Sequence, residues 1–300
     1  KVESHFMKKI LLFLGCSVFL PVIACTTFAT FNTESGNLMM AKNRDNRPDH
    51  QIVEVVNASG RYKYLALSRL DVKDFVSAGI NEKNLAVFNE VTIEYSAQAV
   101  GGIADDFSKD ILQNYAHARD VIKDLPKLIA KFPDPVFYQV ADGQNILSIE
   151  VAPNHKFKYT LQSRGVFAHT NHYQNSDLVA NYPYGASDVI SKQGSEMRLQ
   201  RASYLLEHES NVGLSQLQQI GLDHSAGANN SIFRTGKEAK PNSIRSLAFF
   251  AVSIPRSSES GVVQVVVNLY NVGEKYHYNL DQAFWAQYTA NYTQLKPAVK

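Results

Sequence analysis

Apolar and polar residues alternate loosely from Cys25 onward, and this pattern predicts a β-hairpin. Residues 25–32 are rich in threonine and phenylalanine, which favour strands. The polar tetrapeptide at 34–37, Glu-Ser-Gly-Asn, is typical of a turn, and an apolar run resumes at 38–42. We therefore expect two paired strands with Cys25 at the free end of the hairpin.

Apolar stretches of strand length recur along the rest of the chain. Shorter ones lie at 51–56, 62–67, 85–91, 137–140, 146–151, 157–161 and 166–169. The turn-forming residues 141–144, Ala-Asp-Gly-Gln, predict a second hairpin. Two later runs, 247–254 and 262–270, are almost continuously apolar, as expected for strands buried on both faces.

Three segments have helical spacing of their apolar residues instead. They are 107–132, for which we expect an interruption at Pro126, and the shorter segments 194–208 and 214–222. The sequence contains no internal repeat and no low-complexity linker. Strands, helices, strands, helices and strands in this order predict a single α+β domain with layered sheets.

The first 24 residues have the pattern of a secretory signal peptide. Two lysines follow Met7, an apolar run extends from Ile10 to Leu20, and compact residues precede Cys25. The run is too short to span a bilayer comfortably. We expect residues 1–24 to be a leader and signal peptide that signal peptidase removes before Cys25. The domain would then comprise residues 25–300, in the periplasm or secreted.

The composition is that of an ordinary globular protein, with 45% hydrophobic and 19% charged residues. It excludes a disordered chain, a collagen-like repeat and a small disulfide scaffold. Thirty basic and 28 acidic residues give a net charge of +2, so no strong field would attract nucleic acid. Removal of residues 1–24 would leave one cysteine, Cys25, and therefore no intramolecular disulfide.

Several common catalytic motifs are absent from the sequence. It contains no G-x-S-x-G, no G-x-x-x-x-G-K-[ST] and no H-E-x-x-H. His169 and His172 have a spacing that can bind a metal, but in a strand their side chains would point to opposite faces. We therefore expect neither a metal site nor a cofactor.

Cys25 carries the chemistry that is present. Cleavage after Ala24 would leave a free α-amine, with an ordinary pKa of about 7.7–8.0, on the same residue as a thiol with a pKa of about 8.5. The amine can serve as base for the thiol, and the thiolate can attack an amide carbonyl to form a thioester acyl-enzyme. Residues 22–25, Val-Ile-Ala-Cys, also fit a loose bacterial lipobox, in which case lipid and acyl groups would block both the sulfur and the amine.

The sequence after Cys25 resembles a family. The start Cys-Thr-Thr-Phe at 25–28, followed by a turn and by Asn-Arg-Asp at 43–45, resembles the N-terminal-nucleophile (Ntn) hydrolases. These include choloylglycine hydrolases, penicillin V acylases and acyl-CoA:isopenicillin N acyltransferase-like proteins. Residues 79–87 resemble their Gly-Ile-Asn-Glu-Lys-Gly-Leu stretch, with Asn84 in place of the last glycine. Residues 169–173, His-Thr-Asn-His-Tyr, resemble a segment of the acyltransferase-like branch, and the likeness spans most of residues 25–270.

The resemblance implies a four-layer αββα sandwich with Cys25 at the end of an inner strand, and it implies roles for particular residues. Cys25 would be the nucleophile, its amine the base, and Asp45 the carboxylate beside that amine. Arg44 would keep Asp45 ionised, and the amide of Asn171 would stabilise the oxyanion. The resemblance also points to Asn89 as a second active-site asparagine and to Arg245 as a late active-site arginine. The alternatives are a surface salt bridge for Arg44 and Asp45, an ordinary strand-end role for Asn171 and a surface position for Arg245.

One departure concerns specificity. Ala41 occupies roughly the place where the choloylglycine branch has its first arginine, so bile-salt specificity should not be inherited. We expect an exported hydrolase of linear, non-peptide amides, with a small-molecule N-acyl amide as substrate. The alternatives are an acyltransferase of the same fold and a non-catalytic periplasmic lipoprotein lipidated on Cys25. The sequence names neither the acyl group nor the leaving amine, and it leaves open whether the chain forms a homo-oligomer.

Overall fold

The structure is a computed structural model that describes residues 25–72, 74–100, 103–236, 240–257 and 259–298. The predicted signal peptide, residues 1–24, lies outside the described residues. Among the helices in these ranges, none has the length and apolar character needed to cross a membrane.

The predicted N-terminal hairpin is confirmed and lies inside a six-stranded antiparallel sheet. The strand order in this sheet is β10-β1-β2-β11-β12-β13. The strands are β1 (Cys25–Phe31), β2 (Leu38–Asn46), β10 (Phe167–His169), β11 (Arg245–Ile254), β12 (Gln264–Leu269) and β13 (Glu274–Asn279). Cys25 therefore begins an inner strand, as expected.

The second sheet has eight strands, all antiparallel to their neighbours, in the order β14-β3-β4-β5-β6-β7-β8-β9. The strands are β3 (Gln51–Val56), β4 (Tyr64–Arg69), β5 (Ala78–Asn81), β6 (Ala86–Val91), β7 (Val136–Ala141), β8 (Ile146–Ala152), β9 (Lys156–Gln162) and β14 (Tyr292–Gln294). The predicted hairpin around residues 141–144 joins β7 to β8. Three short strands, β5, β13 and β14, have no counterpart in the sequence predictions.

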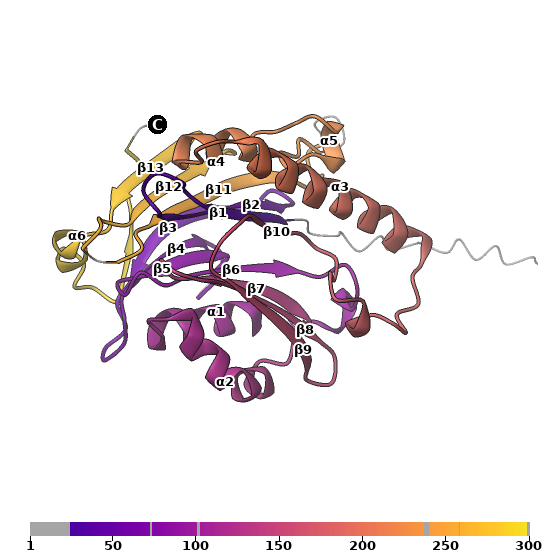
Figure 1. The fold of residues 1–300 in the computed structure, drawn as a ribbon, viewed down its shortest axis with the longest axis horizontal. Helices are drawn as coiled ribbons and strands as arrows, with labels where there is room; N and C mark the ends of the chain where they lie inside the picture. Colours follow the sequence, from indigo (N-terminus) through magenta and orange to yellow (C-terminus); the bar gives the residue numbers. More distant parts are fainter. Residues whose placement is uncertain (1–24, 73, 101–102, 237–239, 258, 299–300) are drawn as a thin grey trace, which may run out of the picture.

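The two sheets stack face to face, and helices cover the outer face of each (Figure 1). The helices are α1 (Ile103–Asn114), α2 (Ala118–Lys131), α3 (Ala186–His208), α4 (Leu214–Gly221), α5 (Gly227–Asn230) and α6 (Gln282–Ala286). One apolar core fills the space between the sheets, with the rings of Phe88 and Phe250 in edge contact at 5.5 Å. A second core joins the larger sheet to α1 and α2, and a third joins the smaller sheet to α3 and α4. The predicted αββα sandwich is confirmed.

The predicted helix break at Pro126 is wrong, because Pro126 lies inside α2. The chain instead breaks at residues 115–117, where side chains from the larger sheet hold both helix ends. Nδ2 of Asn81 donates to the carbonyls of Leu112 and Tyr115 at the end of α1. Asp142 accepts from the backbone N–H of Ala118 at the start of α2. Tertiary contacts therefore decide the position of the break.

α3 also begins earlier than predicted, at Ala186 rather than at residue 194. Its first turns expose Val189 and Ile190. An exposed apolar pair does not follow the periodicity by which a helix with one buried face is recognised.

Candidate active site

The register between β1 and β2 sorts the side chains around Cys25 onto two faces. Cys25 lies opposite Arg44, and Thr27 lies opposite Lys42. Directly opposed residues share a face of an antiparallel pair, so Lys42 and Arg44 point to the same side as the thiol, between the sheets. Asn43 points the other way and donates to the carbonyls of Gly221 in α4 and Ile232.

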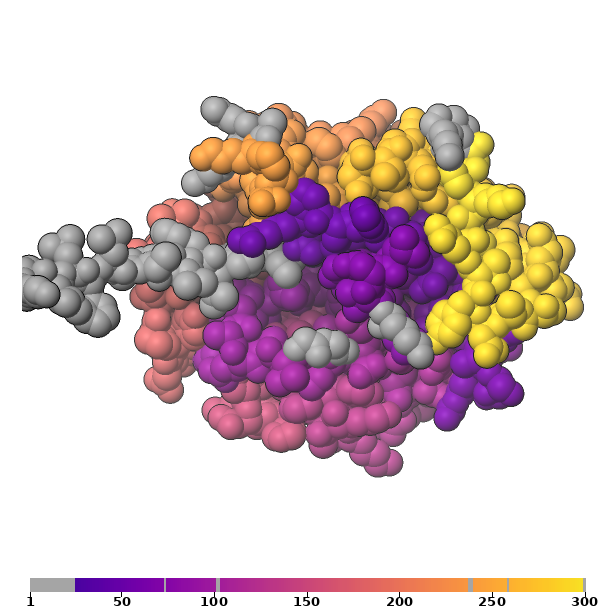
Figure 2. Space-filling view, turned by 180° about the vertical axis from the view of Figure 1, so that it is seen from behind, coloured from indigo at the N-terminus to yellow at the C-terminus, as the bar shows by residue number. Residues whose placement is uncertain are grey.

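Cys25 lies in a small cavity of about 190 Å³ between the two sheets, and only 4% of the residue is exposed. Figure 2 shows the face on which the N-terminal strands, in indigo and violet, lie between the orange and yellow C-terminal segments and the magenta helices. Residues from both sheets and from α1 line the cavity: Cys25, Lys42, Arg44, Asp45, Asn46, Arg69, Phe75, Ser77, Asn89, Val91, Ala99, Val100, Ala104, Asp105, Asp134 and Val136.

Asn171 contacts the nitrogen of Cys25. The backbone N–H of Cys25 donates to Oδ1 of Asn171 at 2.7 Å, and Nη2 of Arg198 donates to the same oxygen at 3.0 Å. Nδ2 of Asn171 donates to the carbonyl of Val91 at 2.8 Å. The expected orientation, with the amide donor toward an oxyanion, is therefore wrong. Two donors, Cys25 and Arg198, orient the acceptor of the carboxamide toward the candidate nucleophile.

The thiol of Cys25 is held in its protonated form by its surroundings. Burial raises the pKa of this thiol above its usual range, and the positive charge of Lys42 offsets part of that effect. The backbone N–H of Asp45 also contacts the sulfur and favours the thiolate. A thiol in this environment needs a base before it can attack a carbonyl carbon.

Lys42 is a buried cation beside the thiol that the sequence analysis did not single out. Its Nζ donates to the carbonyl of Ser77 at 2.8 Å, to Oγ of Ser77 at 2.9 Å and to the carbonyl of Asn89. Burial lowers the pKa of Lys42. Ala41, at the place expected for an early cation, instead packs in the core beneath α3 and α4.

Asp45 is fully buried, on the opposite face of β2 from the thiol. Oγ of Ser246 donates to its Oδ1 at 2.6 Å, and Nη1 of Arg234 lies 4.0 Å from its Oδ2. Burial raises the pKa of Asp45 to about 6, against the opposing effects of Arg234 and Ser246. The carboxylate is therefore held by Ser246 and Arg234, and not by the expected contact with the nitrogen of Cys25.

Arg44 forms no ion pair with Asp45, and its charge is the smallest of the effects that offset the burial of Asp45 and favour its ionised form. Nη2 of Arg44 lies 2.9 Å from Oδ2 of Asp49, and its guanidinium lies over the ring of Phe75 at 5.0 Å. Adjacent residues of a strand point to opposite faces, so Arg44 lines the cavity while the carboxylate of Asp45 lies behind the sheet.

Asn89 borders the cavity, but its amide is used elsewhere. Nδ2 donates to the carbonyl of Val76 at 2.6 Å and to Oγ of Ser108 at 3.0 Å. Its main-chain carbonyl accepts from Lys42. Asn89 therefore contributes to the site through its backbone, and the prediction of an active-site amide at this position is not supported.

Arg245 lies outside the cavity. Its Nη2 donates to the carbonyl of Lys240 at 2.6 Å, and its Nε donates to the carbonyl of Ser243 at 3.4 Å. Arg245 therefore fixes the loop that precedes β11, and the prediction of an active-site role for it is wrong. Arg234 is the arginine beside Asp45.

His169 and His172 do not converge on one site. His169 lies between Glu90 and Glu150, whereas Nδ1 of His172 is 2.9 Å from Oγ of Ser195. Burial lowers the pKa of His172 to about 4. Within the part of the chain that the structure describes, no group of three or more His, Cys, Asp or Glu residues is arranged to hold a metal ion.

Lys42, Arg198 and Arg234 are therefore the site residues that sequence reasoning missed. Lys42 had a signal, because it alternates with Arg44 in a strand predicted to pair with that of Cys25. Arg198 is buried in α3, where Nε donates to Oγ1 of Thr26 at 3.2 Å across 172 positions in sequence. A contact between residues so far apart in the chain leaves no local pattern in the sequence.

A family model for acyl-coenzyme A:6-aminopenicillanic acid acyl-transferase matches residues 31–253 of the chain. A search of curated protein sequences gives no significant match to this chain. Among solved structures, a mutant of the conjugated bile acid hydrolase from Clostridium perfringens is similar, with a TM-score of 0.61, 13% identity and coverage of 90% of this chain and 96% of that one. Penicillin V acylase from Agrobacterium tumefaciens is similar with a TM-score of 0.50, 12% identity and coverage of 86% and 89%.

Proposed function

Because this chain belongs to the acyl-coenzyme A:6-aminopenicillanic acid acyl-transferase family and has the Ntn-hydrolase fold, we propose that it is an exported enzyme that cleaves linear, non-peptide amides with Cys25 as nucleophile. The enzyme class, amide hydrolysis or acyl transfer, follows from the family and the fold. The nucleophile, the export and the bond that is cleaved are the proposal.

One observation carries the assignment of Cys25: its nitrogen lies 2.7 Å from Oδ1 of Asn171, beside a buried thiol. Once residues 1–24 are removed, this nitrogen becomes the α-amine. An amine that donates one N–H to a fixed acceptor has a restricted orientation, which can direct its lone pair toward the thiol of the same residue.

The reaction can then be derived from the residues in place. The amine of Cys25 takes the proton of its thiol, and the sulfur attacks the amide carbonyl carbon. The Lys42 ammonium and the backbone N–H of Asp45 favour negative charge on the sulfur. The tetrahedral intermediate collapses to a thioester as the amine returns the proton to the departing nitrogen. A second nucleophile then attacks the thioester and releases the acyl group.

The cavity supports a substrate with a compact acyl group. Val91, Val100 and Val136 contribute apolar lining to the cavity that contains Cys25. Arg44, which lies across the ladder from Cys25, and Arg69 also line the cavity and share the carboxylate of Asp49, at 2.9 and 3.4 Å. A volume of about 190 Å³ fits a small aliphatic or aromatic acyl group. Such an acyl group would pack on the valines, and the leaving amine would lie toward the charged lining residues.

Acyl transfer to an amine differs from hydrolysis in the second nucleophile alone, and the description of the matching family favours it as the second candidate. The lipoprotein alternative is less compatible with the geometry. Cys25 is 4% exposed and pairs with Arg44 of β2, and its strand is also paired with β10 from Thr27 onward. A lipid chain on its sulfur would therefore have to occupy the small cavity.

The test compares the mature protein, beginning at Cys25, with a form that retains residues before Cys25. Both are assayed on a chromogenic phenylacetyl or phenoxyacetyl amide, and intact mass shows the N-terminus and any thioester adduct. We expect turnover and an acyl adduct in the mature form alone, because a peptide nitrogen cannot act as base.

Mature Cys25→Ser is the matched control, and we expect it to fold but to lose most turnover, since a hydroxyl is far less acidic than a thiol. Equal activity of the mature and extended forms would exclude the amine as base. Wild-type rates in the serine variant would place the nucleophile elsewhere, and a lipid mass on Cys25 would favour the lipoprotein.

A further inference from the structure

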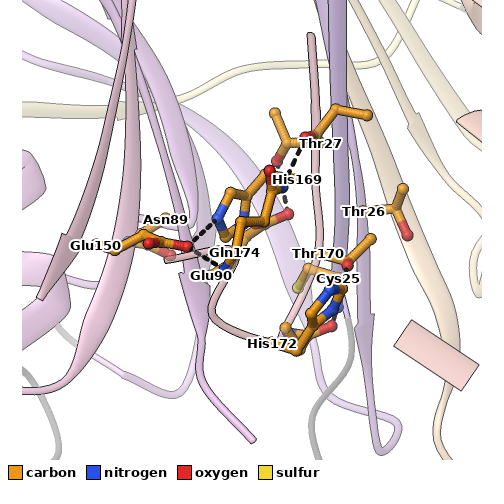
Figure 3. A network of polar contacts seen from close by, with 12 residues as sticks. Cys25, Thr26, Thr27, Asn89, Glu90, Glu150, His169, Thr170, His172 and Gln174 are labelled. Atoms are coloured by element: carbon orange, nitrogen blue, oxygen red, sulfur yellow. Dashed lines mark hydrogen bonds and ion pairs between the residues drawn. The ribbon is translucent and has the colours of Figure 1, made fainter. Parts of the chain in front are cut away.

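A buried histidine lies between two carboxylates at the end of the sandwich that carries Cys25. Nδ1 of His169 is 3.0 Å from Oε2 of Glu90, and Nε2 is 3.1 Å from Oε1 of Glu150. Figure 3 shows the imidazole between the two acidic side chains, with Thr27 beside it and Cys25 farther along the same strand. His169, Glu90 and Glu150 are 2%, 1% and 2% exposed. We call these three residues the carboxylate clamp.

The clamp joins the two sheets at the candidate active site. His169 belongs to β10 in the smaller sheet, whereas Glu90 belongs to β6 and Glu150 to β8 in the larger sheet. Oγ1 of Thr27, two positions after Cys25 in β1, donates to Oε1 of Glu90 at 2.8 Å. The clamp therefore contacts both the strand of the nucleophile and the strand that leads to Asn171.

Glu150 also fixes the turn that follows β10. It accepts from the backbone N–H groups of Gln174 at 2.6 Å and Asn175 at 3.1 Å, and from the side chain of Asn175. Asn171 lies between these contacts and His169, in the same turn. Its carboxamide is therefore anchored on both sides along the chain by one network.

The charge of the clamp depends on His169. Both ring nitrogens face carboxylate oxygens, so two hydrogen bonds require a proton on each nitrogen and a positive imidazole. Burial alone would lower the pKa of His169, but the hydrogen bonds to Glu150 and Glu90 raise it to about 9. A neutral imidazole would leave one buried carboxylate oxygen facing a ring nitrogen that carries no proton, which is costly.

Other charged groups face the clamp from the neighbouring elements. Lys42 of β2 and Arg198 of α3 lie close enough to Glu90 to be affected by its charge. His172, in the turn after β10, is affected by His169 and Glu150. From β7, the ring of Phe137 packs on His169 at 4.6 Å and contributes no charge.

We propose that the carboxylate clamp is the positioning device of the active site, which holds Asn171 against the nitrogen of Cys25 only while the His169 imidazole carries a proton. His169, Glu90 and Glu150 are positioning residues that act through Asn171 and Thr27. The consequence for turnover rests on the proposed function. The consequence for the turn at residues 169–175 does not.

The kinetic test uses the mature protein and the isosteric variants Glu150→Gln and Glu90→Gln. We expect each to lower kcat on the order of 10- to 100-fold, since small displacements of catalytic groups have effects of this size, with KM changed by less than about threefold. Wild-type activity should fall as the pH rises through about 9, and this alkaline limb should move to lower pH in both variants.

Glu207→Gln and His277→Gln, at exposed positions, are the matched controls and should keep the wild-type limb. Unchanged kcat and an unmoved limb in the clamp variants would overturn the proposal. So would a variant that loses melting temperature but keeps its turnover per folded molecule.

A second measurement needs no substrate and separates this proposal from the proposed function. ¹⁵N NMR of histidine-labelled protein should show His169 doubly protonated at pH 7.5, with a change to the neutral form near pH 9. Over the same pH range, amide hydrogen exchange at Asn171, Gln174 and Asn175 should rise above the general base-catalysed increase seen at exposed loops.

A neutral His169 at pH 7.5, or exchange at these three residues that follows the exposed loops, would overturn the clamp even in an active enzyme. If the protein shows a doubly protonated His169 and the expected rise in exchange but no amidase activity, the clamp is supported and only the proposed function is contradicted.

Discussion

Asn171 presents an oxygen acceptor to the nitrogen of Cys25, and this makes its role testable by changing one atom. In Asn171→Asp the acceptor remains but carries negative charge. A carboxylate beside an amine stabilises the ammonium form and raises the pKa of the amine. We expect the rising limb of kcat/KM to move to higher pH by on the order of one unit.

Asn171→Ala, which removes the acceptor, is the comparison and should lower kcat by about 100-fold without moving the limb. If Asn171→Asp lost rate at every pH with no shift, the amide N–H rather than the oxygen would be the functional atom.

Asp45 gives a second prediction at the scale of one residue. Its pKa is raised from 3.8 to about 6 by burial, so the native state holds this proton more tightly than the unfolded chain. The contribution of Asp45 to the free energy of unfolding therefore falls as the pH rises from about 4 to about 6. Activity should move in the opposite direction and rise through about pH 6, if the ionised carboxylate is needed to hold Arg234 and Ser246.

The measurement is kcat between pH 4.5 and pH 7.5 in the wild type and in Asp45→Asn, which should lack the limb near pH 6. Asp105, another cavity residue, also has a pKa raised to about 6 by burial. Asp105→Asn is therefore the necessary comparison. An acid limb that disappears in Asp105→Asn and persists in Asp45→Asn would assign the titration to Asp105 and contradict the need for ionised Asp45.

At the scale of elements, Asn81 determines where the helical layer on the larger sheet is broken. Its amide donates to the carbonyl of Leu112 in α1 and to that of Tyr115 just after it, and its oxygen accepts from the backbone N–H groups of Lys83 and Leu85 at 3.0 and 2.9 Å. The side chain is fully buried, so Asn81→Ala leaves several backbone groups without partners. We expect a loss of about 2–4 kcal/mol in the free energy of unfolding, measured in urea.

The control lies three positions later. Asn84 has a φ of 66°, in the left-handed region, which explains why glycine suits this place in the resembling motif. Asn84→Gly should therefore change stability by less than about 0.5 kcal/mol. Equal losses in the two variants would mean that the loop as a whole, and not the bonds of Asn81, is responsible.

Strands were predicted well from the sequence where one face or both faces of the strand are buried. The hairpin β1–β2 and the buried strand β11 follow directly from their patterns of threonine, phenylalanine and aliphatic residues. The break between α1 and α2 could not be predicted, because Pro126 is the local signal and Asn81 and Asp142 supply the stronger, distant one. Short edge strands such as β14, whose residues are exposed or only partly buried, give no pattern to recognise.

At the scale of the whole molecule, the two sheets are held together by apolar packing along most of their length and by the carboxylate clamp at the catalytic end. The folded pKa of His169, about 9, lies above its ordinary value of 6.5. Its stabilising contribution is therefore complete below pH 6.5 and is lost as the pH rises through about 9. We expect urea unfolding to show a lower free energy of unfolding at pH 9.5 than at pH 7.

The same comparison in Glu90→Gln should give a smaller difference between the two pH values, because the folded pKa of His169 would lie closer to 6.5. A difference as large as that of the wild type would assign the alkaline loss of stability to other groups.

The candidate site was predictable in part. The motifs around Cys25, Asp45 and Asn171 name three residues that the fold brings to one end of the sandwich. The contacts that orient their side chains were not predictable, because they involve partners that no local pattern indicates. Arg198 reaches Asn171 across 27 positions, and Ser246 reaches Asp45 across 201. The motif also suggested Arg44 as the residue that keeps Asp45 ionised, whereas the pleat of β2 separates the two side chains and leaves Arg44 a minor effect.

An insertion in the N-terminal hairpin should have different consequences before and after Leu38, where β2 begins. Residues 33–35 of the turn are exposed, and an added residue there leaves every cross-strand partner of Cys25 unchanged. An added residue within β2 before Lys42 would exchange its two faces, turning Lys42 toward the helices and its neighbour toward the thiol. The number of residues after the cysteine is thus a poor guide for finding the corresponding cation in related chains. The residue across the ladder from Thr27 is the better one, whatever the length of the turn between them.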